Sequence, residues 1–313
     1  MPLSHSQRLT PSTILLLLIP PLMWAGNAVV GRLMHGVVPP FTLNFLRWAL
    51  AFLLLLPFAS WVLRPGSGFR KNWRHFALLG LLGVGSYNSL QYMALTTSTP
   101  INVTLVAACT PVWMLLIGRV LYGVPISRQA ALSAALSLSG VAVVLSHGNL
   151  TQLLAVQLVP GDAWMLLATL VWAGYSWQLA LPRPGAELAH IRADWAAFLL
   201  AQIAMGLLWS GLSTGGEWLL LPAVDANGSS PITWGWPLAA ALVFVAIGPS
   251  LLAYRCWGAG VARVGPTIAG FFSNLTPLFA ALLSATLLGE MPHLYHAMGF
   301  ALIVGGILVS SRK

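Results

Sequence analysis

Apolar runs long enough to cross a lipid bilayer occupy most of this sequence. A membrane-spanning helix needs about 20 predominantly apolar residues. Such runs cover residues 12–33, 40–62, 74–96, 99–121, 127–146, 161–181, 192–213, 234–257, 262–288 and 293–311. Of the 313 residues only 7% are charged, too few to form the polar shell of a soluble fold. We therefore predict an all-α membrane protein of ten transmembrane helices without a separate soluble domain.

The segments between the runs carry loop-forming residues. Three are longer than the rest, 63–73, 182–191 and 214–233, and their Gly, Pro, Ser and charged residues predict loops. The first apolar run lacks the cleavage pattern of a secretory signal, so we expect it to remain as the first helix.

Lys and Arg gather on one side of the predicted membrane. If the N-terminus is cytoplasmic, thirteen of the fifteen basic residues lie on the cytoplasmic side, Arg32 lies outside and Arg47 lies within the second helix. Cytoplasmic loops carry this excess of Lys and Arg. We expect both termini in the cytoplasm and the chain in the inner membrane. The net charge of +9 then reflects topology, not nucleic-acid binding.

The chain contains an internal repeat. Shifts of 166 and 148 residues superpose Pro100 on Pro266, Thr110 and Pro111 on Thr276 and Pro277, and Trp24-Ala25-Gly26 on Trp172-Ala173-Gly174. The predicted halves are 12–147 and 161–312, each with five helices. Because five is odd, the second half starts on the opposite side of the membrane, which makes the repeat inverted. Such repeats place a substrate site between the halves and let it open to either side, so a carrier is favoured over a channel.

These motifs resemble the drug/metabolite transporter superfamily, in particular ten-helix carriers with two EamA-type repeats. The resemblance covers about residues 12–312. It rests on the residues above together with Asn27, Leu46-Arg47-Trp48 and Leu288-Gly289-Glu290. Gly289-Glu290 corresponds to Gly123-Val124 in the first half, so only one half carries this carboxylate. The resemblance implies transport of small metabolites, often export. The aromatic and hydrophobic amino-acid exporters are the subgroup closest in character.

Polar and aromatic side chains within the predicted helices are the candidates for substrate binding, because such groups usually face the protein interior or a cavity. The candidates are Trp24, Asn27, Tyr87, Asn88, Gln91, Trp113, Trp172, Tyr175, Gln178, Ser250, Tyr254, Trp257, Phe271 and Asn274. The repeat pairs Asn27 with Tyr175, Asn88 with Tyr254 and Gln91 with Trp257. Any single Asn or Gln could instead bond one helix to another, a contact worth ~0.6 kcal/mol.

Rings and amides suit neutral or zwitterionic solutes. The predicted helices 3, 4, 8 and 9 have no pair of basic residues near the membrane centre, which disfavours phosphorylated cargo. We therefore expect amino acids, with lipophilic drugs or another neutral metabolite as the alternative. Prolines within the predicted helices are candidate helix breaks whose free N–H groups could bind a carboxylate, although each could instead be a packing kink. They are Pro20-Pro21, Pro100, Pro111, Pro266 and Pro277.

The charged residues near the membrane are candidates for gating or coupling. Arg47 could extend toward the outer surface, pair with Glu290 or Asp162, or bind substrate, and a structural role is favoured. No carboxylate lies in the middle of a predicted span. Proton-coupled carriers usually need one there, so we predict a facilitator, or coupling through Glu290 or Asp162.

Other function classes lack their residues. The predicted spans contain no pairing of nucleophile and base inside the membrane, so we do not expect an enzyme. The two cysteines, Cys109 and Cys256, and the seven histidines do not have the spacing of metal ligands. We expect no metal and no cofactor, and partners limited to a small-molecule substrate and the bilayer, with a monomeric chain and no nucleic acid.

Overall fold

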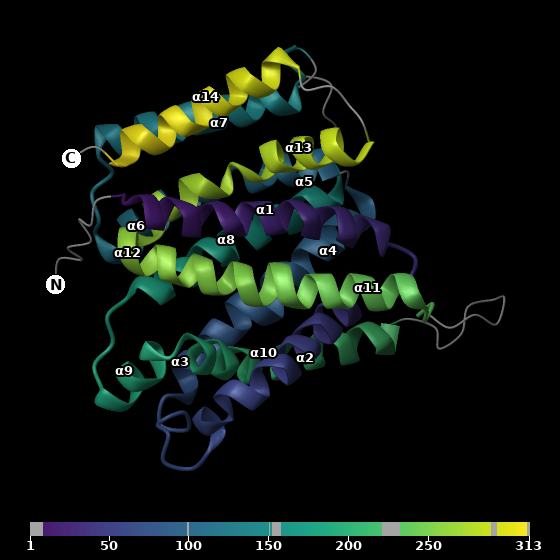
Figure 1. The fold of residues 1–313 in the computed structure, drawn as a ribbon, viewed down its shortest axis with the longest axis vertical. Helices are drawn as coiled ribbons and strands as arrows, with labels where there is room; N and C mark the ends of the chain where they lie inside the picture. Colours follow the sequence, from purple (N-terminus) through teal and green to yellow (C-terminus); the bar gives the residue numbers. More distant parts are fainter. Residues whose placement is uncertain are drawn as a thin grey trace.

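The computed structural model describes residues 9–98, 100–149, 151, 158–220, 232–288 and 293–311. Within these residues the regular structure is entirely helical, as predicted (Figure 1). The elements of the first half are α1 (Pro11–Leu33), α2 (Pro40–Ala59), η1 (Ser60–Leu63), α3 (Trp73–Leu79), η2 (Gly80–Ser86), α4 (Tyr87–Thr97), α5 (Pro100–Ala107), α6 (Thr110–Tyr122) and α7 (Arg128–Leu145). Those of the second half are α8 (Pro160–Ala180), α9 (Ala186–Ala193), α10 (Trp195–Leu220), α11 (Trp236–Val245), η4 (Ala246–Leu252), α12 (Ala253–Ser273), α13 (Thr276–Leu288) and α14 (Leu294–Ser311).

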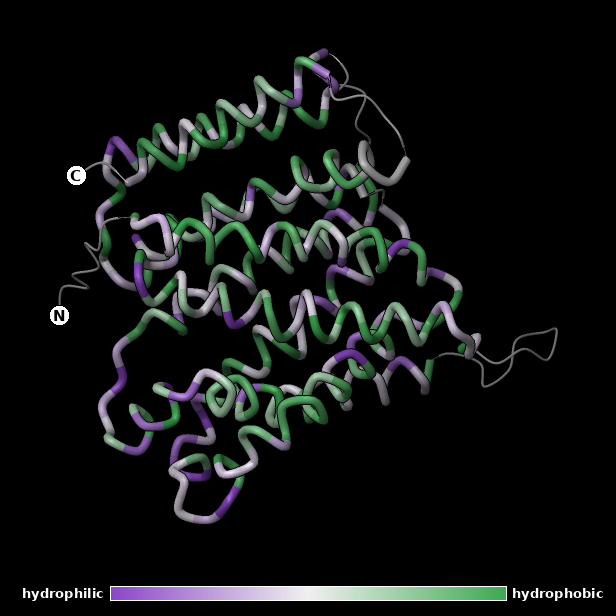
Figure 2. The backbone as a smooth tube through the Cα atoms, in the orientation of Figure 1, coloured by the Kyte–Doolittle hydropathy of each residue, from purple (hydrophilic) through white to green (hydrophobic). Residues whose placement is uncertain are grey.

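Within the described ranges, seven helical stretches are long and apolar enough to cross a membrane. Figure 2 shows apolar residues along these helices. The longest stretch, Trp236–Ser273, has 38 residues. At 1.5 Å per residue it measures about 57 Å, nearly twice the ~30 Å core of a bilayer. It bends at Gly265, whose φ of 79° and ψ of 166° are non-helical, so this one stretch contains two differently directed helices.

Two predicted loops are partly helical. Segment 182–191 contains most of α9, because Leu188 and Ile191, three residues apart, are both buried. Segment 214–233 begins with the end of α10, which continues to Leu220. There the Glu217 carboxylate accepts hydrogen bonds from the first N–H groups of α2, at Phe41 (3.0 Å) and Thr42 (2.8 Å). The carboxylate thus caps a neighbouring helix and gives the polar end of α10 a fixed partner.

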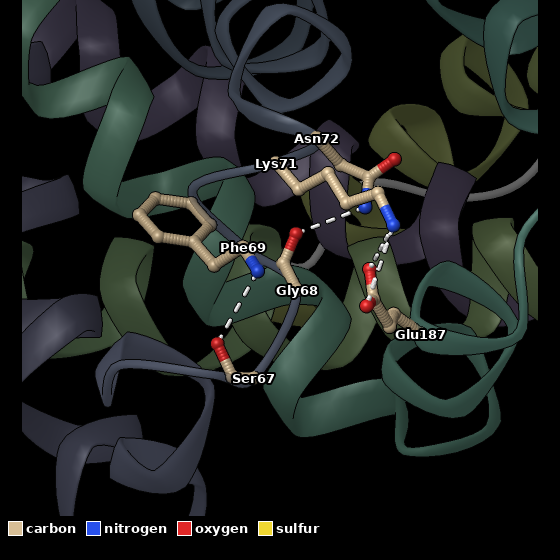
Figure 3. A network of polar contacts seen from close by, with 6 residues as sticks. All are labelled: Ser67, Gly68, Phe69, Lys71, Asn72 and Glu187. Carbon is tan, nitrogen blue, oxygen red and sulfur yellow. Dashed lines mark hydrogen bonds and ion pairs between the residues drawn. The ribbon is translucent and has the colours of Figure 1, made fainter.

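The turn before α3 lies against α9 (Figure 3). Lys71 Nζ lies 3.2 Å from Glu187 Oε2, with both side chains exposed. Within the turn, the Asn72 amide donates to the Gly68 carbonyl at 2.9 Å and the Phe69 N–H donates to Ser67 Oγ at 3.2 Å. An exposed ion pair contributes little to stability. The conformation of this turn therefore depends on the hydrogen bonds within it.

The predicted repeat reappears in the helix boundaries. At a shift of 166 residues α6 superposes on α13, α7 on α14, and α5 on residues 266–273 of α12. The helices α7 and α14 lie side by side at one edge of the molecule (Figure 1). They approach closely at glycine, since a Cβ on Gly140 would lie 2.7 Å from the Gly299 carbonyl oxygen.

The shift also superposes two π-helical segments, η2 on η4. Each closes with a bond across five residues, from the Tyr87 N–H to the Leu82 carbonyl and from the Ala253 N–H to the Gly248 carbonyl. Such wide turns occur mostly as single turns inside α-helices, frequently at functional sites. Their repetition marks the same place in both halves.

Candidate functional site at the centre of the repeat

Six aromatic side chains from α1, α4, α8 and α12 pack together at the centre of the molecule. We call them the ring cluster: Trp24, Tyr87, Trp172, Tyr175, Tyr254 and Trp257. Trp172 lies at its middle and contacts the five other rings at centroid distances of 4.8–5.5 Å. All six are candidates that the sequence predicts, and the structure brings them together.

Residues related by the repeat touch one another. The rings of Trp24 and Trp172 meet edge to face at 5.1 Å. Asn88 Nδ2 donates to the hydroxyl of Tyr254 at 3.4 Å. Two related residues can touch only where they are close to the axis that relates them. The pseudo-two-fold axis therefore passes through the ring cluster.

The π-helical segments place polar groups beside this axis. Tyr87 and Asn88 directly follow η2, while Ser250 lies in η4 and Tyr254 follows it. The wide turn frees carbonyl groups that side chains then bind. Ser250 Oγ donates to the Val245 carbonyl at 2.7 Å, and the Tyr254 hydroxyl donates to the carbonyl of Gly83.

A small cavity of about 30 Å³ lies next to Trp24 and Trp172. Its lining consists of Trp24, Ala28, Tyr87, Gln91, Val103, Thr104, Ala107, Thr110, Trp172, Ser273 and Thr276. Three pairs in this lining are related by the repeat, namely Trp24 with Trp172, Ala107 with Ser273 and Thr110 with Thr276. This space, which we call the central cavity, can hold a few waters but no metabolite.

The central cavity lies at the helix breaks that the prolines predict. α5 ends at Ala107 and α6 begins at Thr110, followed by Pro111. The same bond closes both breaks: Thr110 Oγ1 donates to the Ala107 carbonyl and Thr276 Oγ1 to the Ser273 carbonyl, each at 2.7 Å.

The expected free N–H groups are absent from the described start of α6. The N–H groups of Val112 and Trp113 donate to the Cys109 carbonyl. Pro277 follows Thr276 at the start of α13 and so holds the position that corresponds to Pro111. Both prolines begin a helix, where the missing N–H is not needed.

Arg47 does not extend to the surface and, among the residues that the structure describes, pairs with no carboxylate, which corrects the expectation from the sequence. Its side chain is 0% exposed. The guanidinium donates to Asn27 Oδ1 (3.0 Å), Asn88 Oδ1 (2.9 Å), the Tyr92 hydroxyl (2.7 Å) and Ser250 Oγ (2.9 and 2.7 Å). We call these five residues the Arg47 cluster. Neutral oxygens from α1, α4 and η4 converge on one point of α2, so the charge is satisfied inside the protein without an anion.

The Arg47 cluster continues to the central cavity. Asn27, which accepts from Arg47, donates through Nδ2 to Gln91 Oε1 at 2.9 Å. Gln91 lines the cavity, and its amide nitrogen and the Tyr87 hydroxyl have no hydrogen-bond partner in the described part of the chain. The buried indole N–H of Trp172 is likewise unpaired there. The site therefore offers unused neutral donors beside apolar rings, with a buried cation two hydrogen bonds away.

The remaining candidates lie outside this centre. Gln178 binds Tyr122 and Arg183 at the end of α8. Asn274 is buried but donates to Ser137 of α7 at 2.8 Å, a helix-to-helix bond. Trp113 and Phe271 pack in the apolar core. None of these four side chains belongs to the lining of the cavity, because the rotation of each helix, which residue spacing alone does not give, decides which side chains reach it.

Of the two carboxylates that are candidates for coupling, Asp162 and Glu290, the structure describes Asp162. Asp162 accepts from Ser98 Oγ at 2.5 Å and from the Val159 N–H at 2.9 Å. It thus binds its own helix start and the end of α4, not Arg47. Glu290 lies outside the described residues.

Sequence reasoning missed the cavity residues with short side chains, Thr104, Thr110, Ser273 and Thr276. The repeated Thr-Pro pairs were a usable signal, because a threonine before a repeated proline break is placed at the break. Tyr92 was also missed, although it follows Asn88 by four residues and so shares its helix face.

The chain is similar to known transporters along nearly its whole length. The profile of the EamA-like transporter family matches residues 11–146 and again 159–312. An uncharacterized transporter of Archaeoglobus fulgidus is 26% identical over 96% of this chain and 98% of its own. The aromatic amino acid exporter YddG of Ancylobacter novellus is 26% identical, covering 93% of both chains. The biotin transporter of Escherichia coli K12 is 25% identical over 95% of this chain and 92% of its own.

A crystal structure has the same fold, with a TM-score of 0.70, 23% identity and 96% of both chains covered.

Proposed function

Since the chain belongs to the EamA-like transporter family, we propose that it exports small zwitterionic or neutral metabolites, above all amino acids with aromatic or hydrophobic side chains. The halves 12–147 and 161–312 would move against each other around the central cavity. We further propose ten spans with both termini in the cytoplasm, in the inner membrane, and a chain that works as a monomer because the site lies within one chain.

The observation that carries this proposal is the central cavity on the repeat axis. A site that opens to alternate sides must lie between the halves, and the cavity is lined by repeat-related pairs from both. Among the described residues its lining contains no carboxylate, histidine, lysine or cysteine, so its Ser and Thr hydroxyls have no base beside them that would activate a nucleophile.

The chemistry of the lining suggests the cargo. Aromatic rings can stack on an apolar side chain. The unpaired donors of Trp172, Gln91 and Tyr87 can bind a carboxylate, and the buried charge of Arg47 favours an anionic group nearby. Two relatives carry the names of an amino-acid exporter and a biotin transporter. Amino acids and biotin each combine a carboxylate with an apolar body, which fits the same set of groups.

Transport by purified protein in proteoliposomes tests the proposal. Vesicles that contain the protein are loaded with labelled Phe, Trp, Leu, Met or Thr. They should release at least the aromatic amino acids faster than loaded vesicles without protein. Release should need no pH gradient, because the described residues place no carboxylate at the cavity. If all five amino acids stay inside while a hydrophobic cation moves, the cargo is a lipophilic drug and the amino-acid proposal is wrong.

A further inference from the structure

A second, larger space lies between α8, α10 and α12. It has a volume of about 580 Å³, within the range of small-molecule sites. At one end lie three buried polar side chains, Tyr175, Gln202 and Tyr254; at the other lie the exposed side chains of Trp195 and Arg255. Leucine, proline and phenylalanine line the walls between. We call this space the crevice.

The crevice lies at a position where the two halves differ in side-chain size. Tyr92 of α4 fills the corresponding space in the first half: a Cβ on Gly31 of α1 would lie 2.9 Å from its ring. Its hydroxyl also donates to Asn27 at 2.8 Å. A shift of 166 residues places Gly258 on Tyr92. A Cβ at Gly258 would meet no atom within 4 Å. The second half therefore keeps open what the first half fills with a ring.

The exposed end of the crevice is cationic. The Arg255 guanidinium lies 4.5 Å over the ring of Trp195 and has no hydrogen bond or ion pair within the described ranges. Arg192 also lines the crevice, with its donors on the carbonyls of Leu181 and Leu179. No carboxylate belongs to the lining in the part of the chain that the structure describes. An anion at this end would meet an arginine whose donors are free and whose position is fixed by a ring.

The inner end joins the site already described. Tyr175 and Tyr254 belong to both the crevice lining and the ring cluster. The Tyr175 hydroxyl donates to Gln202 at 2.9 Å. A molecule in the crevice thus touches the rings around the repeat axis. Hydrogen-bonding groups at the closed end suit a metabolite better than the tip of a lipid acyl chain, which has no polar atoms.

We propose that the crevice is a binding site for amphipathic carboxylates, through which they reach the ring cluster. The carboxylate binds Arg255 and the apolar body lies between α8, α10 and α12. This inference rests on the proposed function, since the proposed topology places Arg192 and Arg255 on the cytoplasmic side from which an exported substrate arrives.

Binding of 4-phenylbutyrate to the purified full chain, measured by calorimetry and thermal stabilisation, tests the site. Its uncharged amide, 4-phenylbutyramide, is the matched ligand, because the two differ only in the carboxylate. The acid should bind at least tenfold more tightly than the amide, as expected for the loss of a charge-assisted bond. Arg255→Gln should remove that difference, whereas Arg128→Gln, at the exposed start of α7, should retain it.

Gly258→Tyr tests the location. The new ring fills the crevice as Tyr92 fills its counterpart, so binding of 4-phenylbutyrate should fall at least tenfold. Gly305→Tyr is the matched control, because a Cβ there also meets nothing within 4 Å and the residue lies on α14, away from the crevice. Wild-type binding by Gly258→Tyr would overturn the proposal. So would stabilisation by phosphatidylglycerol vesicles but not by the free acid, which would identify a lipid as the occupant.

The outcomes also separate this inference from the proposed cargo. Transport of amino acids that Gly258→Tyr leaves unchanged would refute the crevice and keep the cargo. Crevice-dependent binding of 4-phenylbutyrate by a protein that moves no amino acid would refute the cargo and keep the crevice.

Discussion

Replacing Arg47 by methionine removes the charge from the Arg47 cluster while keeping an unbranched side chain. Methionine does not incur the several kcal/mol that burial of a cation costs, so the loss comes from the oxygens left behind. Asn27 Oδ1 still accepts from Tyr92, and Ser250 Oγ still donates to Val245. Asn88 Oδ1 loses the one donor that the structure gives it. An orphaned buried acceptor costs about 1–3 kcal/mol.

The substitution also removes the bonds from Arg47 to Ser250 and Tyr92, whose loss costs less because both hydroxyls keep another partner. In total we expect Arg47→Met to lower the free energy of unfolding by about 2–4 kcal/mol. At about 2–4 °C per kcal/mol this is a fall in Tm of roughly 4–16 °C. The Tm is measured by heating the detergent-solubilised protein and using size-exclusion chromatography to determine how much folded protein remains at each temperature. Arg32→Met is the control, because Arg32 is exposed and makes one bond, to the Leu95 carbonyl at 3.0 Å.

A second substitution sharpens the experiment. Asn88→Leu in the Arg47→Met background removes the orphaned acceptor, and replacing both partners by apolar groups can be nearly neutral. The double variant should therefore regain part of the lost stability, a coupling that a double-mutant cycle measures. Two results would contradict this reasoning: a free energy of unfolding of Arg47→Met within about 0.5 kcal/mol of wild type, or an equal loss of unfolding free energy in Arg32→Met. Either would mean that the hydrogen bonds of the Arg47 cluster do not stabilise the fold.

Three further substitutions have expected outcomes. Gln91→Leu removes an unpaired donor from the central cavity and should raise KM for the transported amino acid about tenfold; an unchanged KM would mean that Gln91 only connects helices. Glu217→Gln weakens the cap on α2 and should cost about 1 kcal/mol of unfolding free energy, read from thermal unfolding. Gly140→Ala forces α7 from the Gly299 backbone and should cost about 1–3 kcal/mol, whereas Gly305→Ala, with open space at its Cβ, should not destabilise. Equal stability of the two alanine variants would contradict the close glycine contact.

The sequence predicted which side chains meet at the centre of the repeat better than how the polar groups there are connected. Superposing the repeats paired Asn88 with Tyr254 and aligned Trp24 with Trp172, and both pairs meet on the axis. That worked because symmetry-related residues near an axis must be neighbours. The partners of Arg47 could not be found in this way, because its oxygens come from three separate elements whose helical rotations no periodicity specifies.

Composition also misled at two places. Segments 182–191 and 214–233 contain Pro, Gly and charged residues, yet parts of both are helical. In each case tertiary contacts decide the structure: Leu188 and Ile191 of α9 are buried against the rest of the fold, and the N–H groups of α2 bind Glu217 of α10. Local propensity gives only the preference of an isolated segment, and tertiary contacts override it.

The two halves share one frame but differ in the polar bond that joins their first two long helices. In the first half, charged Arg47 of α2 binds Asn27 of α1. In the second, neutral Gln202 of α10 binds Tyr175 of α8, the repeat partner of Asn27. Separating α1 from α2 would strip a buried guanidinium of a hydrogen bond, whereas separating α8 from α10 breaks a neutral one, which costs less. The helices that cost less to separate, α8 and α10, also border the crevice, which Gly258 leaves unfilled because it has no side chain. Both differences between the halves therefore favour access between α8, α10 and α12.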